Sequence, residues 1–210
     1  MFTKAVLPDT IRALKLVSNI SVVKKSYLAG GTALALHLGH RYSFDLDFFT
    51  QAVFDEKALL SELKTLPEFK EDGTGWRTVW GKVSKTKFSL FYYEYPLIKK
   101  TVNFEGIQIL QKEDIAAMKI QAVEDRGTKR DFFDLYFLAQ EFSLQQMLKF
   151  YNQKYGNLKE HIYIIIRSLN YFKDAERDDD PEMLTPLSWE KVKKFFQSQT
   201  IKLAKDKFKI

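Results

Sequence analysis

The 210-residue sequence contains no cysteine and only three histidines. The absence of cysteine excludes disulfide bonds and thiolate-held zinc or iron–sulfur sites among its own residues. No apolar stretch approaches the ~20 residues that a membrane-spanning helix needs. The first residues, Met1-Phe2-Thr3-Lys4, lead into a polar amphipathic segment rather than an apolar signal core. These absences predict a cytoplasmic protein without membrane association.

Aromatic residues and positive charge are plentiful by comparison. A hydrophobic fraction of 45%, with 18 Phe and 10 Tyr, is typical of a packed core and argues against disorder. The net charge of +6 favours an anionic partner only weakly. Near the C-terminus the segment 191–210 contains seven lysines and a single acidic residue, Asp206. The lysines are Lys191, Lys193, Lys194, Lys202, Lys205, Lys207 and Lys209. This segment is either a nucleic-acid-binding face or a solvated helix surface.

The hydrophobic periodicity predicts an α+β N-terminal half and an all-helical C-terminal half. In the first half we expect helices over 9–24, 33–38 and 55–66, and strands over 27–29, 44–49, 76–83, 88–95 and 107–110. In the second half we expect helices over 114–124, 129–142, 143–154 and 158–171, and a terminal helix that begins at Ser188. The corresponding domains are an α/β core over 1–110 and a helical region over 111–210 packed on that core.

Two carboxylates stand two residues apart in the apolar segment Ser43-Phe44-Asp45-Leu46-Asp47-Phe48-Phe49. Side chains alternate between the faces of a strand, so Asp45 and Asp47 are expected on one face and Leu46 on the other. Adjacent like charges at the edge of a core need neutralisation. Mg²⁺ provides it with oxygen ligands and leaves positions for substrate phosphates. A lone Asp-x-Asp is more often a solvated loop or a helix cap, but the aromatic flanks argue against that interpretation.

A glycine turn precedes the carboxylates, in the segment Leu28-Ala29-Gly30-Gly31-Thr32. We expect a strand to end at Gly30 and Gly31 and a helix to begin with Thr32 as its N-cap. Free N–H groups and the positive end of a helix form a ready phosphate site, to which Thr32 would add a hydroxyl donor. Arg41 and Ser43 can reach the same pocket, although Arg41 could instead pair with the nearby carboxylates. The two segments together predict metal-assisted phosphoryl or nucleotidyl transfer.

A second group of charges lies on two predicted helices of the C-terminal half. Lys119 stands in an apolar helix, and Asp131 and Asp134 lie one turn apart on the next. One interpretation is an internal salt-bridge network that joins the helices. The functional alternative is that Lys119 binds nucleotide phosphates while an aspartate orients or deprotonates the attacking hydroxyl.

These residues resemble the AbiEii/AbiGii toxin group of the nucleotidyltransferase superfamily. The resemblance is carried by residues 28–41, by 43–49, by Lys119 through Arg126 to the segment 129–138, and by 169–176. It implies a small mixed sheet flanked by helices, extended by a C-terminal helical bundle. It also implies NTP as substrate, Mg²⁺ as cofactor, a cognate antitoxin as partner, and an RNA acceptor such as a tRNA 3′ end.

The resemblance assigns a role to each candidate residue. Gly30, Gly31 and Thr32 match the phosphate turn, and Asp45 and Asp47 match the metal-binding carboxylates. Lys119 matches a lysine that contacts nucleotide, and Asp131 or Asp134 matches the acidic residue of the final motif.

One departure concerns Ser89, which stands where many polymerase-like nucleotidyltransferases carry a third carboxylate. A missing acid weakens two-metal chemistry. Catalysis could then use one metal, or the chain could be a degenerate module that only binds a nucleotide or a partner. A third alternative keeps the transfer and replaces RNA by a protein or small-molecule acceptor. Aromatic residues and the basic C-terminal segment favour RNA.

Overall fold

The structure is a computed structural model that describes residues 1–208 of the chain. Its residues cluster into two compact units, Met1–Gln111 and Lys112–Ile210. None of the described helices is long and apolar enough to cross a membrane.

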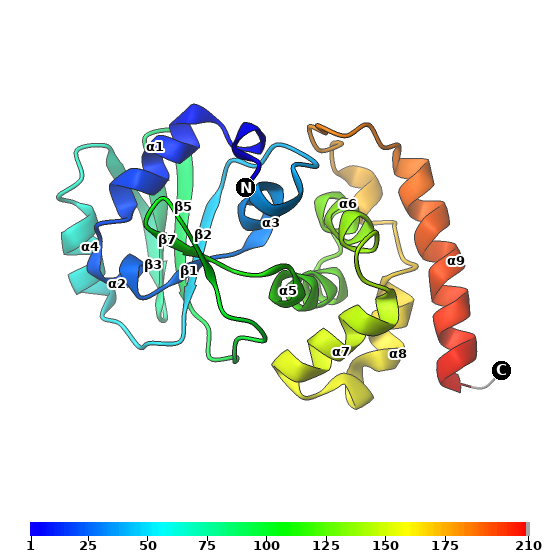
Figure 1. The fold of residues 1–210 in the computed structure, drawn as a ribbon. Coiled ribbons are helices and arrows are strands. Elements are labelled where there is room, and N and C mark those ends of the chain that lie inside the picture. The colour runs from blue at the N-terminus through cyan, green and yellow to red at the C-terminus, as the bar shows by residue number, and fades with distance from the viewer. Residues whose placement is uncertain (209–210) are drawn as a thin grey trace. The chain divides into compact units, whose positions relative to one another are not determined.

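The first unit is built on a mixed seven-stranded sheet with the order β3-β4-β5-β2-β1-β7-β6 (Figure 1). The pairs β2–β5 and β1–β7 are parallel, and the other neighbouring pairs are antiparallel. The strands are β1 (Tyr27–Leu28), β2 (Leu46–Thr50), β3 (Phe69–Gly75), β4 (Thr78–Val83), β5 (Thr86–Tyr92), β6 (Val102–Phe104) and β7 (Ile107–Ile109). The expected α+β class with a small mixed sheet is confirmed.

Three of the helices of this unit cover one face of the sheet. The helical elements of the unit are η1 (Thr3–Ala5), α1 (Pro8–Val17), α2 (Ser21–Lys24), α3 (Gly30–Leu38) and α4 (Glu56–Leu63). Figure 1 shows α1, α2 and α4 on the same side of the strands. The side chains that point toward these helices are apolar and fully buried, including Leu46, Phe48, Phe88 and Leu90. Alternate residues of β2 and β5 therefore face the other side, which carries the carboxylates.

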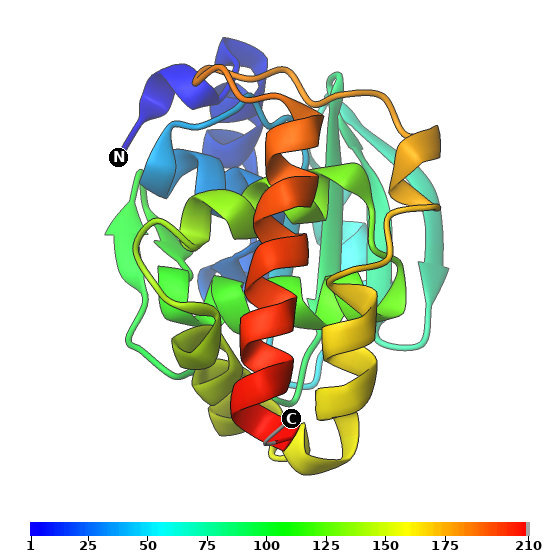
Figure 2. The same cartoon turned by 90° about the vertical axis from the view of Figure 1, so that its right-hand side faces the viewer.

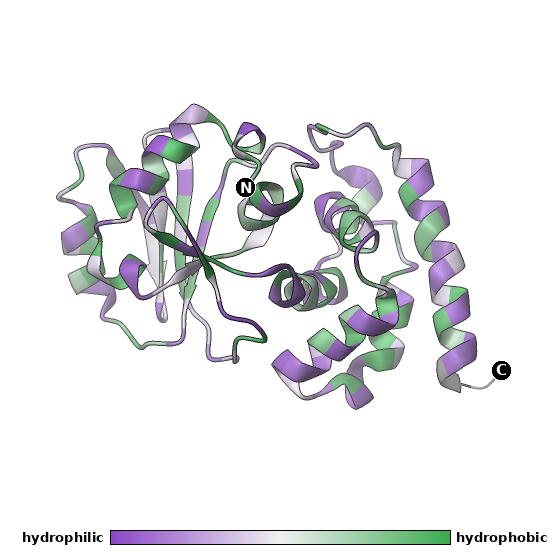
Figure 3. Ribbon diagram, viewed as in Figure 1, coloured by the Kyte–Doolittle hydropathy of each residue, from purple (hydrophilic) through white to green (hydrophobic). Residues whose placement is uncertain are grey.

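The second unit is a helical bundle. Its elements are α5 (Lys112–Asp125), α6 (Lys129–Leu138), α7 (Leu144–Tyr155), α8 (Leu158–Ser168), η2 (Ala175–Arg177) and α9 (Trp189–Phe208). Figure 2 shows α9 as the longest helix of the bundle, and Figure 3 shows polar and apolar residues alternating along it. Aromatic rings hold it to the bundle, since Phe132 on α6 contacts Phe172, Trp189 and Phe196.

Several expected boundaries are wrong. The helix expected over 9–24 is divided into α1 and α2, because the chain leaves the helix at Ser18 and Ile20 is extended. Strand β2 begins at Leu46 rather than at residue 44, so Asp45 precedes the strand. Strands β3 and β6 were not expected from the sequence at all.

Candidate functional site

The glycine turn joins β1 to the first turn of α3. Helix α3 begins at Gly30 with Ala29 as its N-cap, so the expected N-cap at Thr32 is wrong. Gly30 adopts a φ of +64°, a left-handed conformation that glycine reaches without steric cost. The turn therefore places Gly30 and Gly31 at the N-terminus of the helix, where backbone N–H groups lack helical acceptors and attract anions.

Asp47 lies directly beside this turn. A Cβ added to Gly30 would stand 3.2 Å from Asp47 Oδ2, and the N–H of Ala29 donates to the carbonyl of Asp47 at 2.9 Å. The carboxylate is thus held against the backbone that would receive a phosphate. A phosphate bound at this turn and the Asp47 carboxylate would repel one another unless a cation lay between them.

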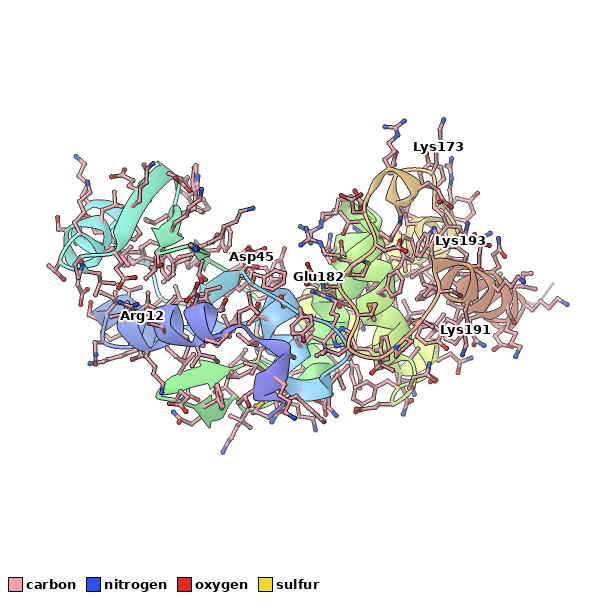
Figure 4. The ribbon with its side chains drawn as sticks, turned by 90° about the horizontal axis from the view of Figure 1, so that it is seen from above. Arg12, Asp45, Lys173, Glu182, Lys191 and Lys193 are labelled. Carbon is pink, nitrogen blue, oxygen red and sulfur yellow. The ribbon has the colours of Figure 1, made fainter. Side chains whose placement is uncertain are left out.

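Asp45 and Asp47 are both half-buried, whereas Leu46 between them is fully buried. The expected alternation holds, although Asp45 belongs to the segment between α3 and β2 (Figure 4). Two carboxylates with phosphate oxygens are a donor set that suits one Mg²⁺ ion. In residues 1–208 there is no cluster of three or more histidine, aspartate and glutamate side chains that could hold a metal ion.

Ser89 is the cross-strand neighbour of Asp47. The parallel pairing of β2 and β5 places these two residues opposite one another, and both are half-buried. The serine therefore occupies the sheet position at which a third carboxylate would adjoin the other two. The residues present fit one metal ion more readily than two.

Thr32 and Ser43 connect α3 to the segment before β2. The buried Thr32 hydroxyl lies 2.9 Å from Ser43 Oγ and also donates to the backbone carbonyl of Asp45. The Ser43 N–H donates to Ala5 O at 3.1 Å. The hydroxyl of Thr32 thereby positions the Asp45 backbone, and its part in phosphate binding stays a prediction.

Arg41 supports the glycine turn from within the unit. Only 3% of the residue is exposed, and its Nη1 donates to Tyr42 O at 2.9 Å. A Cβ added to Gly31 would stand 2.4 Å from Arg41 Nη2 and 3.1 Å from Ser43 Oγ. The guanidinium therefore adds positive charge under the turn, and only glycine leaves it room.

The second unit contains the predicted charge network. Lys119 Nζ on α5 lies 2.8 Å from Asp131 Oδ1 and 2.6 Å from Asp134 Oδ2 on α6. The lysine side chain is 8% exposed, and the two aspartate side chains are 1% and 0% exposed. The three residues thus form the salt bridges between two helices that the first interpretation predicts. Lys129, the first residue of α6, makes contacts outside this network, with Asp178 and Asp180.

Asp131 accepts from two further side chains. Arg126 reaches both of its oxygens, at 3.0 and 3.2 Å, and the Thr128 hydroxyl lies 2.6 Å from Oδ2. Burial acts to raise the pKa of Asp131, but the charge of Lys119 and the hydrogen bonds and charge of Arg126 outweigh it, so its pKa lies well below the ordinary value. A carboxylate of such low basicity is a poor proton acceptor at neutral pH. Its geometry suits it to fix the position of Lys119.

The Thr128 contact was not expected from the sequence. Thr128 stands three residues before Asp131, which is the spacing of a capping box, but the threonine side chain makes no hydrogen bond to the helix backbone and instead donates to the carboxylate. A threonine three residues before a buried acid is the signal that could have revealed it.

The basic C-terminal segment is partly neutralised. Lys193 pairs with Glu176 at 2.7 Å and with Glu190 at 2.6 Å, and Asp206 accepts from Gln145. Figure 4 shows Lys191 and Lys193 on α9. Lys191, Lys194, Lys202 and Lys205 are exposed, whereas Lys209 lies outside the described residues.

Comparison with known proteins identifies a family for this chain. The model of the family described as nucleotidyl transferase AbiEii toxin, type IV TA system, matches residues 17–96 and 92–208. The uncharacterised protein aq_aa25 of Aquifex aeolicus (strain VF5) is 38% identical over 191 residues, which cover 88% of this chain and 91% of that protein.

Solved structures with low sequence identity share the fold. MenT4, a nucleotidyltransferase toxin from Mycobacterium tuberculosis H37Rv, has a TM-score of 0.61 at 15% identity, with 94% of this chain and 84% of that chain covered. The antibiotic-resistance factor ANT(2″)-Ia has a TM-score of 0.51 at 12% identity, with 74% of this chain and 98% of that chain covered.

Proposed function

Because the chain belongs to the AbiEii nucleotidyltransferase toxin family, we propose that it transfers a nucleoside monophosphate from an NTP to a hydroxyl group of RNA. The observation that carries the proposal is the contact between the glycine turn and Asp47. An anion-binding helix terminus beside two half-buried carboxylates is the arrangement that a metal–triphosphate complex needs.

In this proposal the backbone N–H groups of Gly30 and Gly31 bind the triphosphate, and Arg41 strengthens the positive potential under them. Asp45 and Asp47 would hold Mg²⁺, which would supply positive charge to offset the negative charge of the phosphates. The acceptor oxygen forms a bond to the α-phosphorus, the bond to the β-phosphate oxygen breaks, and pyrophosphate departs while the hydroxyl loses its proton to water. Thr32 and Ser43 keep the Asp45 backbone in place.

Lys119 is proposed to contribute its positive charge to nucleotide binding, as the family resemblance implies. Asp131 and Asp134 then act as positioning residues, because their contacts fix the ammonium group. The corresponding test measures nucleotide affinity in Lys119→Met and in Lys149→Met, which changes an exposed lysine of the same unit. A loss of affinity in Lys119→Met alone, in a variant that circular dichroism melting shows to be folded, supports this role.

The acceptor and the biological role follow from the family. We propose tRNA 3′ ends as acceptor, toxicity as the consequence of their modification, and inhibition by a cognate antitoxin. Exposed lysines and aromatic residues of the described chain suit contacts with phosphates and bases.

One observation favours a second function. Ser89 opposite Asp47 leaves the carboxylate pair without a third acidic neighbour on β5. A degenerate module that binds an NTP without transferring it would retain the glycine turn and Asp47 in the same geometry.

The test uses each of four α-³²P-labelled NTPs with total tRNA and Mg²⁺, and parallel reactions with chelator. Label on RNA that requires Mg²⁺ supports the proposal and identifies the preferred base. Label on protein or on a small molecule instead of RNA contradicts the acceptor but retains the transfer. Absence of label together with calorimetric NTP binding supports the degenerate module.

A further inference from the structure

A row of lysines crosses the sheet beside the carboxylates, on strands that the proposed function does not use. Antiparallel pairing places Lys70 of β3 opposite Lys82 of β4, and Lys82 opposite Lys87 of β5. All three residues are exposed. Paired residues share one face of a sheet, so the three amines project from the same face.

This is the face that carries Asp47. Lys87 lies two residues before Ser89 on β5, and Ser89 pairs with Asp47. Since side chains two apart on a strand point the same way, the lysine row and Asp47 share the face that α1, α2 and α4 leave open. Neighbouring strands are about 4.8 Å apart, so the row extends over about 10 Å across the three strands.

Like charges directly opposite one another destabilise a sheet. Of the acidic residues near the row on β3 and just before it, Glu68 pairs with Arg12 and Glu71 pairs with Lys64, which leaves the exposed Asp72 at the β3 bulge as one negative charge against three lysines. The row therefore remains a concentration of positive charge. Lys85, exposed in the turn between β4 and β5, extends it.

Trp80 adds an aromatic surface next to the row. It pairs with Ser89 on one side and with Gly73 on the other, so it lies in the same cross-strand line as Asp47. Its indole rests on the β3 backbone, since a Cβ added to Gly73 would stand 2.5 Å from Trp80 Cζ2 and one added to Gly75 would stand 3.5 Å from Cζ3. The residue remains 39% exposed, which leaves ring surface open to a stacking partner.

We propose that the open face of β3, β4 and β5 binds single-stranded RNA, with Lys70, Lys82 and Lys87 on its phosphates and Trp80 stacked on a base. This inference rests on the proposed function, in which it supplies the acceptor-binding surface. A cationic groove combined with an exposed aromatic ring is the combination that holds single strands. The surface ends at Asp47, so the bound strand leads toward the carboxylates.

The test measures RNA binding without catalysis. A fluorescein-labelled single-stranded 12-mer RNA is titrated with the full chain in chelator and without NTP, and binding is followed by fluorescence polarisation. The triple variant Lys70→Gln/Lys82→Gln/Lys87→Gln is compared with Lys24→Gln/Lys25→Gln/Lys57→Gln, which removes the same charge from exposed lysines of the same unit. Circular dichroism melting establishes that each variant is folded.

We expect the first triple variant to bind at least about tenfold more weakly than the control. Its salt dependence should also be shallower by about 2 in the slope of log K against log salt, since each phosphate contact with a single strand contributes about 0.7. Trp80→Leu should weaken binding about tenfold with an unchanged slope, whereas Trp76→Leu, at the most exposed tryptophan, should not.

The proposed RNA-binding surface would be contradicted if both triple variants lost RNA affinity equally, or if the first triple variant bound RNA as tightly as the wild type. Failure of the wild-type chain to bind the 12-mer would also contradict it. These results are separable from the chemistry: transfer to RNA with an unaffected triple variant would contradict only this surface. Binding through the lysine row without any transfer would contradict only the proposed activity.

Discussion

Gly31 is the residue at which the candidate site tolerates the least change. Its backbone conformation is not left-handed, so its requirement for glycine comes from the neighbouring Arg41 and Ser43 side chains. Because Arg41 is buried, its guanidinium cannot move freely into solvent. A methyl group at Gly31 must displace either the turn or the guanidinium.

Gly31→Ala is therefore expected to lower NTP affinity by about a hundredfold, as displacements of about 1 Å do in preorganised sites. Gly156→Ala is the control, because Gly156 has a φ of +73° but nothing lies within 4 Å of an added Cβ. The control should lose stability by about 1–2 kcal/mol and retain NTP affinity. Calorimetry with a non-hydrolysable NTP analogue measures the difference, and equal affinity in both variants would contradict the role of the turn.

Asp131 gives the second unit a defined pH dependence. Its pKa is lowered in the folded state, so the stabilisation is complete above the unfolded pKa of about 3.9 and is lost as the pH falls below that value. The stability difference between wild type and Asp131→Asn should be large at pH 7 and shrink as the pH is lowered from 4 to 3. Urea unfolding at each pH measures it. A stability difference that stays constant over this pH range would contradict the assignment.

At the scale of elements, α5 organises the second unit through charged side chains five residues apart. Asp114 pairs with Lys154 of α7, Lys119 with Asp131 and Asp134 of α6, and Glu124 with His161 of α8. Five residues turn a helix by about 500°, so successive groups face different directions. Each direction meets a different helix, which makes α5 the central element of the bundle.

The buried pair Asp114–Lys154 allows a test of this arrangement. Both side chains are 0% exposed and their charged atoms lie 2.8 Å apart. Lys154→Met should cost about 3–5 kcal/mol because it leaves a buried carboxylate, whereas Lys154→Met combined with Asp114→Leu should recover most of that loss. Denaturant unfolding of the two single variants and the double variant measures the coupling. A double variant no more stable than Lys154→Met would contradict this account.

Elements with a strong apolar pattern could be predicted from the sequence, and polar ones could not. Strands β4 and β5 alternate buried and exposed residues, and the pattern revealed them. Strand β3 reads Phe-Lys-Glu-Asp-Gly-Thr-Gly and has no buried residue, so only its pairing with β4 makes it a strand. The packing of the Trp80 ring on Gly73 and Gly75 could therefore not be predicted from the sequence.

At the scale of the whole molecule, the proximity of the candidate residues could be predicted from the sequence more readily than their individual contacts. Asp45, Asp47 and the two glycines stand close together in sequence, and a single strand–helix–strand unit brings them together. The hydrogen bond of Thr32 to the Asp45 carbonyl and the burial of Arg41 depend on three-dimensional packing that no local pattern encodes.

The central claim is that Asp47 holds the metal–triphosphate complex against the glycine turn. The most direct test compares the rate of label transfer from α-³²P NTP to tRNA in wild type, Asp47→Asn and the exposed strand control Asp72→Asn, with thermal unfolding of each. The account predicts a loss of at least about a hundredfold in Asp47→Asn, with unchanged melting and a fully active Asp72→Asn. Transfer by a folded Asp47→Asn at the wild-type rate would contradict it.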